Sequence, residues 1–272
     1  MQEELKLIAQ WVRDHGVNVL SDEDALKIPE EALPDKPKIM AIEKVEREGV
    51  VEEVEVEEDW WVAGLEGLEA EGVDVVNSSV GYPAWHPFEK RDGRTAKSTL
   101  AADAAVERGV VVVAAVGNCL RVAPPADGFG VISVGACDLS GRWLPFSARG
   151  PTADGRIKPE LCAPGRDIIV ASAGSLDDYR LASGTSLSAA IVSAMAALIL
   201  EGMPGLSPLQ LKLALMETAS HPDSPDNLTG WGMANGLNAF LMLRGPLPVV
   251  PIPHPIPLLW GGAKTGVFGG RF

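Results

Sequence analysis

A chain of 272 residues with 46% hydrophobic and 22% charged side chains can bury the core of one large domain or of two small ones. The formal net charge is −14, and residues 1–72 hold 21 of the 37 acidic residues but 7 of the 23 basic ones, so the rest of the chain is balanced. The sequence has no basic stripe, which excludes a typical nucleic-acid-binding surface, and the acidic run Val50–Asp59 indicates a solvated face.

The three cysteines, Cys119, Cys137 and Cys162, are odd in number and form no CxxC pair, which argues against a disulfide scaffold and against a zinc site. Each stands beside small residues in an apolar, strand-like run, so we expect buried free thiols. Met1–Asp14 lacks the apolar core of a secretory signal. The uncharged stretch Leu181–Leu200 is rich in Ser, Ala and Gly, so we expect no membrane-spanning helix there. The localisation stays open.

Apolar periodicity predicts helices and strands that alternate along the chain. In chain order these are a helix over Glu3–Arg13, a strand at Lys38–Ile42, a helix over Trp60–Ala70, a strand at Asp74–Val80, a helix over Ser98–Arg108, strands at Val110–Val116, Val131–Gly135 and Asp167–Ser172, and helices over Ser186–Glu201 and Pro208–Ala219. Val110–Val116 is almost entirely valine and alanine, which is typical of a strand buried on both faces of a parallel sheet. The alternation predicts an α/β domain whose sites lie at the carboxyl ends of the strands.

Composition divides the chain into three parts. Residues 1–36 form a divergent or truncated N-terminal segment, residues 37–244 the main domain, and residues 245–272 a tail rich in proline and glycine. Within the tail, Pro246–Pro257 alternates proline with aliphatic residues and Gly261–Gly270 is rich in glycine. This composition predicts a polyproline-like linker or a disordered tail.

One short segment carries the residue types needed for nucleophilic chemistry. Ser183–Ser188 reads Ser-Gly-Thr-Ser-Leu-Ser and opens a helix of small residues. A serine hydroxyl needs a base within reach and donors for the oxyanion that it generates. A helix N-terminus offers free backbone N–H groups and a favourable dipole for negative charge. Taken alone, the pattern also fits an ordinary serine or threonine N-cap on a buried helix.

The motif at Gly184–Ser188 resembles the nucleophile motif of the subtilisin family, the subtilases. Four further segments resemble other motifs of that family and occur along the chain in the family's order. They are Val75–Gly81, Val112–Asn118, the run of Phe146–Pro151, Asp154–Pro159 and Ala163–Gly165, and Asn227–Gly232. Together they cover about residues 38–243. The resemblance implies a three-layer α/β/α subtilisin-like fold with a mainly parallel central sheet, incomplete at its N-terminus.

The same resemblance implies a serine-type endopeptidase that hydrolyses peptide bonds through an acyl-enzyme. Ser186 is then the nucleophile, and the side-chain amide of Asn118 and the backbone N–H of Ser186 hold the oxyanion. Taken alone, Asn118 also fits a turn residue after Gly117. The residues expected to flank the specificity pocket are Ser79, Val80, Gly81, Ala115, Val116 and Gly117.

The expected partners are protein or peptide substrates, which bind as an added strand, and neither nucleic acid nor membrane. We expect no cofactor, and structural calcium stays open.

The sequence assigns the histidine and the aspartate of a Ser-His-Asp triad less directly than the serine. The sequence contains neither Asp-Ser-Gly nor Asp-Thr-Gly, the usual context of the family's aspartate, and a separate N-terminal fragment could supply it. His15 is the histidine in the family's order, in a His-Gly-x-x-Val setting, and is the candidate general base. Alternatively, His15 and Gly16 form an ordinary helix C-terminus, because a helical stripe precedes them.

Three functions remain open. The first is a serine endopeptidase whose true start lies upstream of Met1 or whose front third is encoded separately. The second is a catalytically impaired relative that binds extended peptides or partner proteins, and the third is an esterase or amidase that keeps the oxyanion hole. Ala190 and Ala194 depart from the family's usual proline and glycine. These departures bear on packing near the nucleophile more than on chemistry.

Overall fold

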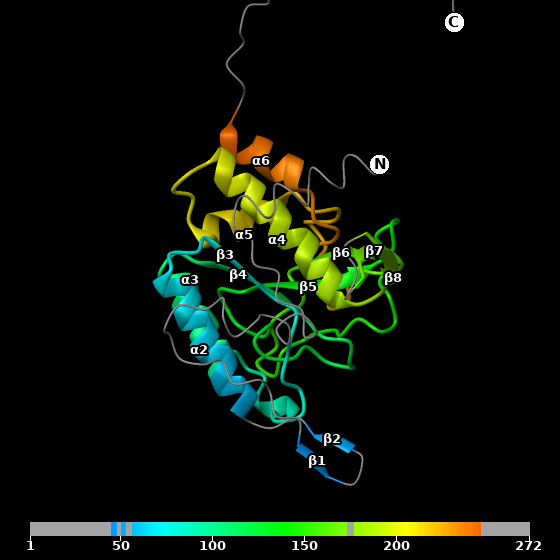
Figure 1. Ribbon diagram of the computed structural model, residues 1–272. Coiled ribbons are helices and arrows are strands. Elements are labelled where there is room, and N and C mark those ends of the chain that lie inside the picture. Colours follow the sequence, from blue (N-terminus) through cyan, green and yellow to red (C-terminus); the bar gives the residue numbers. More distant parts are fainter. Residues whose placement is uncertain (1–44, 48–49, 53–55, 173–176, 246–272) are drawn as a thin grey trace, which may run out of the picture.

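The computed structural model describes residues 45–47, 50–52, 56–172 and 177–245 (Figure 1). The candidate base His15, the helix expected at Glu3–Arg13, the strand expected at Lys38–Ile42 and residues 246–272 of the tail lie outside these residues. The division of the chain into three parts therefore stays a prediction.

A four-stranded parallel sheet forms the centre of the fold. Its strands are β3 (Val75–Ser78), β4 (Val111–Ala115), β5 (Ile132–Cys137) and β6 (Leu161–Pro164), and they are adjacent in that order. Val76 lies opposite Val112, Val113 opposite Ile132, and Gly135 opposite Cys162. Two antiparallel pairs stand apart from this sheet, β1 (Val45–Arg47) with β2 (Val50–Glu52) and β7 (Ile168–Ala171) with β8 (Tyr179–Ala182).

Helices cover both faces of the sheet (Figure 1). One layer contains α2 (Val56–Ala70) and α3 (Lys97–Glu107), and the other contains α4 (Thr185–Gly202), α5 (Pro208–Glu217) and α6 (Gly236–Arg244). A short 3₁₀ helix, η2 (Phe88–Lys90), lies in the connection between β3 and α3.

The residues of β4 alternate between two apolar clusters, because successive side chains of a strand point to opposite faces. Val111, Val113 and Ala115 pack with buried residues of α4 and α5, whereas Val112 and Ala114 pack with residues of α2 and α3. All five residues are buried, as their composition predicts. The expected three-layer α/β/α fold with a mainly parallel sheet is therefore confirmed.

The expected elements within the described residues are present, but the sequence did not predict β1, β2, β6, β8, η2 or α6. The chain at Leu161–Pro164 forms β6, which the sequence did not reveal because this run of four residues is short and ends in proline. The expected strand at Asp167–Ser172 exists as β7, but it pairs with β8 in a hairpin outside the main sheet. Its residues are half-buried or exposed, whereas β6 is almost wholly buried.

The helix α4 is long and apolar enough to cross a membrane by length and composition, and it is the one such helix among the described residues. In the fold its buried residues, Ala189, Val192 and Ala196 among them, pack against the strands of the sheet in one apolar cluster. Core helices of globular domains share these properties of length and composition.

Two cysteines match the expected buried free thiols, and the third does so in part. Cys137 and Cys162 are buried and form no disulfide, whereas Cys119 is half-buried. The Cys119 Sγ donates a hydrogen bond of 3.1 Å to the carbonyl oxygen of Arg121. Cys119 therefore lies in the loop after β4 rather than in the core.

Candidate functional site

The N-terminus of α4 lies against the carboxyl end of β6. The N–H of Gly184 donates to the carbonyl oxygen of Gly165 over 2.8 Å, and the Ser188 hydroxyl donates to the carbonyl oxygen of Ala163 over 3.0 Å. A Cβ atom at position 165 would lie 2.5 Å from Ser188 Oγ and 2.6 Å from Ala136 Cβ, so glycine is required there. The close packing of small residues thus fixes the position of Ser186, the second residue of α4.

The candidate nucleophile contacts the end of β3 through two hydrogen bonds. Ser186 Oγ donates to the carbonyl oxygen of Ser79 over 3.1 Å, and Ser79 Oγ donates to the carbonyl oxygen of Ser186 over 3.3 Å. Deeper in the core, Ser193 Oγ donates to Asn77 Oδ1 over 3.0 Å. Helix α4 is therefore held to β3 at two levels, and Ser186 is half-buried beside residues of the expected substrate groove.

Asn118 extends from the loop after β4 toward the same point. Its Oδ1 accepts hydrogen bonds from the backbone N–H of Thr185 over 3.0 Å and from Thr185 Oγ1 over 3.1 Å. A backbone N–H can only donate, so the oxygen of the amide must face Thr185 and the NH₂ group must face the opposite way. Among the described residues, Nδ2 of Asn118 has no acceptor, and the residue is exposed. The structure therefore brings an oriented amide donor next to the residue that precedes Ser186.

The residues expected to flank the specificity pocket differ in accessibility. Ser79, Val80, Gly81 and Gly117 are half-buried, whereas the side chains of Ala115 and Val116 belong to the buried core. The backbone of Val116 is already used, since its N–H donates to Val134 and its carbonyl accepts from Ala123. The side chains on the Ser79–Gly81 side are therefore more accessible to a substrate, although the carbonyl oxygens of Ser79 and Val80 already accept hydrogen bonds from Ser186 and Ser78.

A Cβ atom at position 81 would lie 3.1 Å from the carbonyl oxygen of Pro124 and 3.3 Å from Ala123 Cβ. Glycine at this position lets the end of the expected groove approach the loop after Asn118 closely. The two groove segments are therefore held side by side.

The described residues do not supply a base to Ser186. His86 Nε2 lies 2.9 Å from Glu58 Oε2, and His221 hydrogen-bonds to Thr229 and Ser220. Burial acts to raise the pKa of Glu58, but hydrogen bonds from Ser98 and His86 hold that pKa below its ordinary value. Glu58 and His86 thus form a satisfied pair that joins α2 to the connection after β3. Residues 45–47, 50–52, 56–172 and 177–245 also contain no cluster of three or more potential metal ligands.

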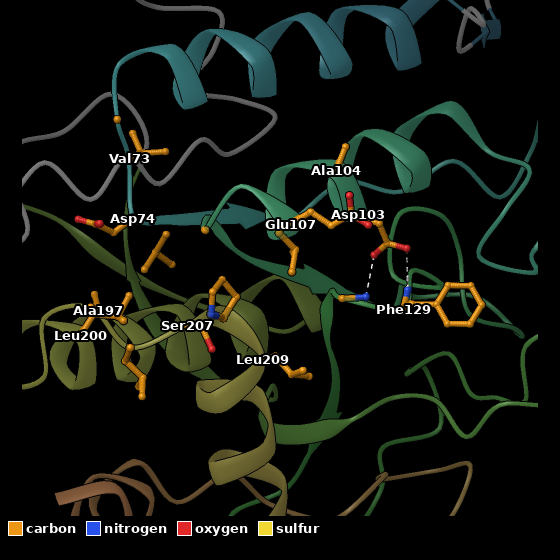
Figure 2. A pocket seen from close by; sticks show the side chains of 18 of the residues that line it. Val73, Asp74, Asp103, Ala104, Glu107, Phe129, Ala197, Leu200, Ser207 and Leu209 are labelled. Atoms are coloured by element: carbon orange, nitrogen blue, oxygen red, sulfur yellow. Dashed lines mark hydrogen bonds between the residues drawn. The ribbon is translucent and has the colours of Figure 1, made fainter.

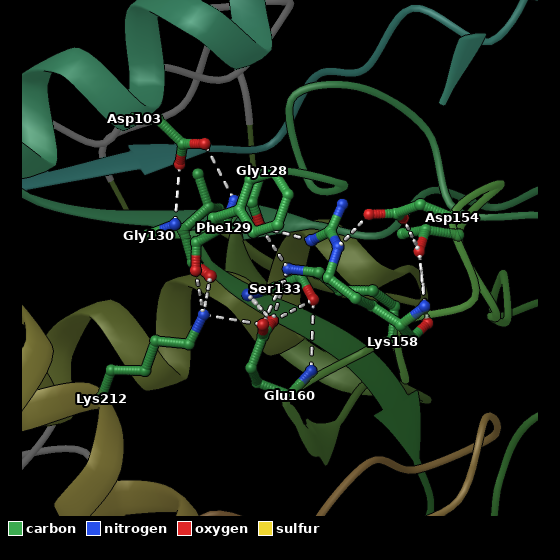
Figure 3. Close-up of polar contacts among 12 residues, drawn as sticks. Asp103, Gly128, Phe129, Gly130, Ser133, Asp154, Lys158, Glu160 and Lys212 are labelled. Carbon is green, nitrogen blue, oxygen red and sulfur yellow. Dashed lines mark hydrogen bonds and ion pairs between the residues drawn. The ribbon is translucent and has the colours of Figure 1, made fainter. Parts of the chain in front are cut away.

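The amino ends of β5 and β6 hold a buried ionic cluster of Lys158, Glu160 and Lys212 (Figure 3). Glu160 Oε1 lies 2.7 Å from the Nζ atoms of both lysines, and Ser133 Oγ donates to Glu160 Oε2. Lys158 also donates to the carbonyl oxygen of Gly128, and Lys212 donates to those of Phe129 and Val131. Sequence reasoning missed this cluster, because lysines are almost always predicted to be exposed.

The charges in this cluster perturb each other. Burial acts to raise the pKa of Glu160, but the two ammonium groups lower it to about 2. Burial lowers the pKa of Lys158 to about 8, even though Glu160 lies beside it, because one carboxylate is shared by two lysines. The cluster has a full set of hydrogen-bond partners and no path to Ser186, so it stabilises the fold rather than the site.

Comparisons with known proteins agree on one family. A family model described as the subtilase family matches residues 45–232. Serine protease AprX of Bacillus subtilis is 31% identical over 205 residues, which are 66% of this chain and 46% of AprX. Subtilisin DY of Bacillus licheniformis is 35% identical over 166 residues, which are 59% of this chain and 54% of that relative. The chain spans about half the length of the curated relatives it matches.

Solved structures resemble the fold as well. The self-cleaved protease domain of PatA aligns with a TM-score of 0.57 and 29% identity, over 69% of this chain and 68% of that one. The MycP3 protease from the type VII (ESX-3) secretion system aligns with a TM-score of 0.56 and 27% identity, over 68% of this chain and 58% of that one.

Proposed function

Because this chain belongs to the subtilase family of serine peptidases, we propose that it is a serine-type endopeptidase with Ser186 as its nucleophile. The observation that carries the proposal is the pair of hydrogen bonds from Thr185 to Asn118 Oδ1. They leave the amide NH₂ of Asn118 and the backbone N–H of Ser186 as two donors beside one hydroxyl.

The reaction follows from this arrangement. Ser186 Oγ attacks the carbonyl carbon of the scissile bond and loses its proton to a general base, and the carbonyl oxygen becomes an oxyanion. Asn118 Nδ2 and the N–H of Ser186 donate to that oxyanion, and the N-terminus of α4 adds a favourable dipole. The C–N bond then breaks as the base returns the proton to the leaving amine, and water later hydrolyses the ester on Ser186.

The general base and its carboxylate partner come from outside the described residues in this proposal. His15 is the candidate base, and its Nε2 would replace the carbonyl oxygen of Ser79 as the acceptor for Ser186 Oγ. A backbone carbonyl cannot take up a proton, so the hydroxyl in its present hydrogen bond is not activated. Activity therefore requires a histidine at this point.

We propose that the triad aspartate, which lies outside the described residues, is carried by a strand that pairs with β3, and that a separate N-terminal fragment can supply this strand. Among the described residues β3 has β4 as its one neighbour in the sheet, although Val76, Asn77 and Ser78 are buried. Backbone groups on an open edge need partners when they are shielded from water, and an added strand supplies them. The carboxyl end of a parallel strand at this edge would lie beside Ser79, which hydrogen-bonds to Ser186.

A second function is favoured by one observation, the lack of a described base at Ser186. A subtilase-like protein without a working triad could still bind an extended peptide along Ser79–Gly81 through backbone hydrogen bonds. In that case Ser186 would act as a polar contact and not as a nucleophile.

A fluorophosphonate probe separates the two functions. We expect the purified chain, alone or mixed with an N-terminal fragment, to become labelled, and Ser186→Ala to abolish labelling. Ser224→Ala removes another exposed serine hydroxyl and should leave labelling unchanged. Labelling that persists in Ser186→Ala would contradict the assignment of the nucleophile. Unlabelled wild-type protein that still binds extended peptides would favour the second function.

A further inference from the structure

A large groove opens at the amino end of the sheet (Figure 2). The lining includes the end of α4, whereas Ser186 lies at the start of that helix. Helix α3 forms one wall, the end of α4 and the start of α5 form the other, and Val73 and Asp74 before β3 lie between them. Its volume is about 1640 Å³. Pockets for small molecules occupy about 300–1,000 Å³, so this groove is large enough for a segment of polypeptide.

The groove is apolar inside and acidic at its edges. Apolar side chains from the three elements line it, among them Val73, Leu200 and Leu209, and the last of these is 58% exposed. Asp74, Glu107 and Glu201 are exposed at the groove, and none of them forms an ion pair within the described part of the chain. The lining also contains a basic side chain, the exposed Arg94, whose guanidinium lies over the Phe129 ring, but the acidic residues outnumber it. A matching occupant would be apolar, with a net positive charge.

The chain leaves the described fold close to this groove. Helix α6 runs beside α4, since a Cβ at Gly236 would lie 3.1 Å from Met195 and one at Gly202 would lie 2.6 Å from Phe240. The C-terminus of α6 is therefore near the C-terminus of α4, where Pro204 and Gly205 line the groove. Gly245 then ends α6 with φ 72°, a conformation that glycine adopts without strain and that turns the chain sharply.

The 27 residues that follow have the chemistry that the groove requires. Pro246–Trp260 contains only proline, aliphatic residues, His254 and Trp260, and residues 246–272 include Lys264 and Arg271 but no acidic residue. Proline restricts the unbound segment, so binding costs less conformational entropy. At about 3.1 Å per residue, a segment of this length is several times longer than α6, whose nine residues rise about 1.5 Å each, so it can reach the groove from Gly245.

We propose that this tail, residues 246–272, folds back and binds in the groove, with its proline-rich part on the apolar lining and Lys264 or Arg271 near the acidic edge. The groove is then an intramolecular binding surface that the C-terminal tail covers. This role would explain why a long apolar segment follows α6 directly. It is independent of whether Ser186 is an active nucleophile.

Hydrogen exchange of the whole chain and of a chain ending at Gly245 tests the proposal. We expect amides of Leu100–Glu107 and Glu201–Leu209 to exchange roughly tenfold faster after truncation, the change that follows the loss of a segment bound about 90% of the time. A fluorescein-labelled peptide of residues 246–272 should bind the truncated chain and restore protection. Unchanged exchange in a truncated chain that remains folded would overturn the proposal.

Variants of the full chain keep the test valid if truncation prevents folding. Leu258→Ser with Leu259→Ser should accelerate exchange at the groove, and so should Glu107→Lys with Glu201→Lys. The control Glu217→Lys changes an exposed acid of α5 outside the groove and should have no effect. Equal exchange in all of these variants would contradict binding by the tail. Protection that rises with protein concentration would instead assign the groove to a second copy of the chain.

Discussion

The two ends of the parallel sheet differ in how fully their polar side chains are hydrogen-bonded. At the amino ends of β5 and β6, three buried charges satisfy one another and the nearby carbonyl groups. At the carboxyl ends of β3 and β4, hydrogen bonds hold the hydroxyl of Ser186 and the amide of Asn118 in place. Within the described part of the chain, the Ser186 hydroxyl has no base beside it and the Asn118 NH₂ group has no acceptor.

This difference separates stability from function. A closed polar cluster in low dielectric rigidifies the fold but offers nothing to a substrate. An oriented donor without a partner can contribute to catalysis, because it forms its strongest hydrogen bond with the negative charge that develops in the transition state. Perturbing the first end should therefore change unfolding, and perturbing the second should change chemistry.

The largest expected effect is on stability, in Glu160→Gln. The substitution leaves the ammonium groups of Lys158 and Lys212 buried without their counter-charge, which typically costs about 3–5 kcal/mol. Urea unfolding monitored by circular dichroism measures the change. The control Glu217→Gln removes an exposed acid on the same side of the molecule and should alter stability little. Equal stability of the two variants would contradict the role assigned to the cluster.

The next effect is on chemistry, in Asn118→Ala. Loss of the amide donor should slow acylation of Ser186 by about 10²–10³, a figure measured for the corresponding asparagine of subtilisin, a member of the same family. The rate of labelling by a fluorophosphonate probe reports the change, and the unfolding free energy should stay nearly constant. A variant that reacts at the wild-type rate would show that Asn118 does not hold the oxyanion.

Acid should weaken the amino end of the sheet selectively. The pKa of Glu160 is lowered to about 2 in the fold from an ordinary value of 4.5, so its contribution to stability is complete above pH 4.5 and is lost as the pH falls toward 2. We expect a loss of about 2–3 kcal/mol over this range. Urea titrations at several pH values should show that the unfolding free energy depends less on pH in Glu160→Gln than in wild type. The same dependence in both proteins would exclude Glu160 as its source.

A smaller effect is expected for Thr185→Val, which removes one of the two hydrogen bonds that orient Asn118. The remaining bond from the backbone N–H keeps the amide near its position, so labelling should slow by roughly fivefold, about 1 kcal/mol. Thr185→Ser retains the hydroxyl and should restore most of the rate. Failure of serine to do so would assign the effect to packing.

The smallest effect is expected at the surface, in Arg142→Ala. Arg142 pairs with Asp138 over 2.9 Å, but its side chain is 82% exposed. Such pairs contribute about 0–1 kcal/mol. The unfolding free energy measured in urea should therefore be nearly the same in this variant and in wild type. A large loss of unfolding free energy would mean that burial does not explain why Glu160→Gln is more destabilising than Arg142→Ala.

Sequence reasoning predicted the local structure around Ser186 and Asn118 better than the buried ionic cluster at the other end of the sheet. The valine and alanine run of β4 and the small residues of α4 have local patterns that determine their structure, and the motifs at Ser186 and Asn118 lie within or next to them. The burial of Lys158 and Lys212 depends on contacts with Glu160 and Gly128, which no local pattern encodes. Sequence reasoning also missed β6, whose four residues end in proline, and it predicted β7 without indicating that this strand lies outside the main sheet.

The central claim is that Ser186 and Asn118 act on one carbonyl oxygen. A crystal structure with a peptidyl boronic acid tests it directly, because the boronate mimics the tetrahedral intermediate. We predict a covalent bond between boron and Ser186 Oγ, with one boronate oxygen about 2.7–3.1 Å from Asn118 Nδ2. A boronate on Ser186 whose oxygens all lie beyond hydrogen-bonding distance of Asn118, or an inhibitor bound at another residue, would contradict the claim.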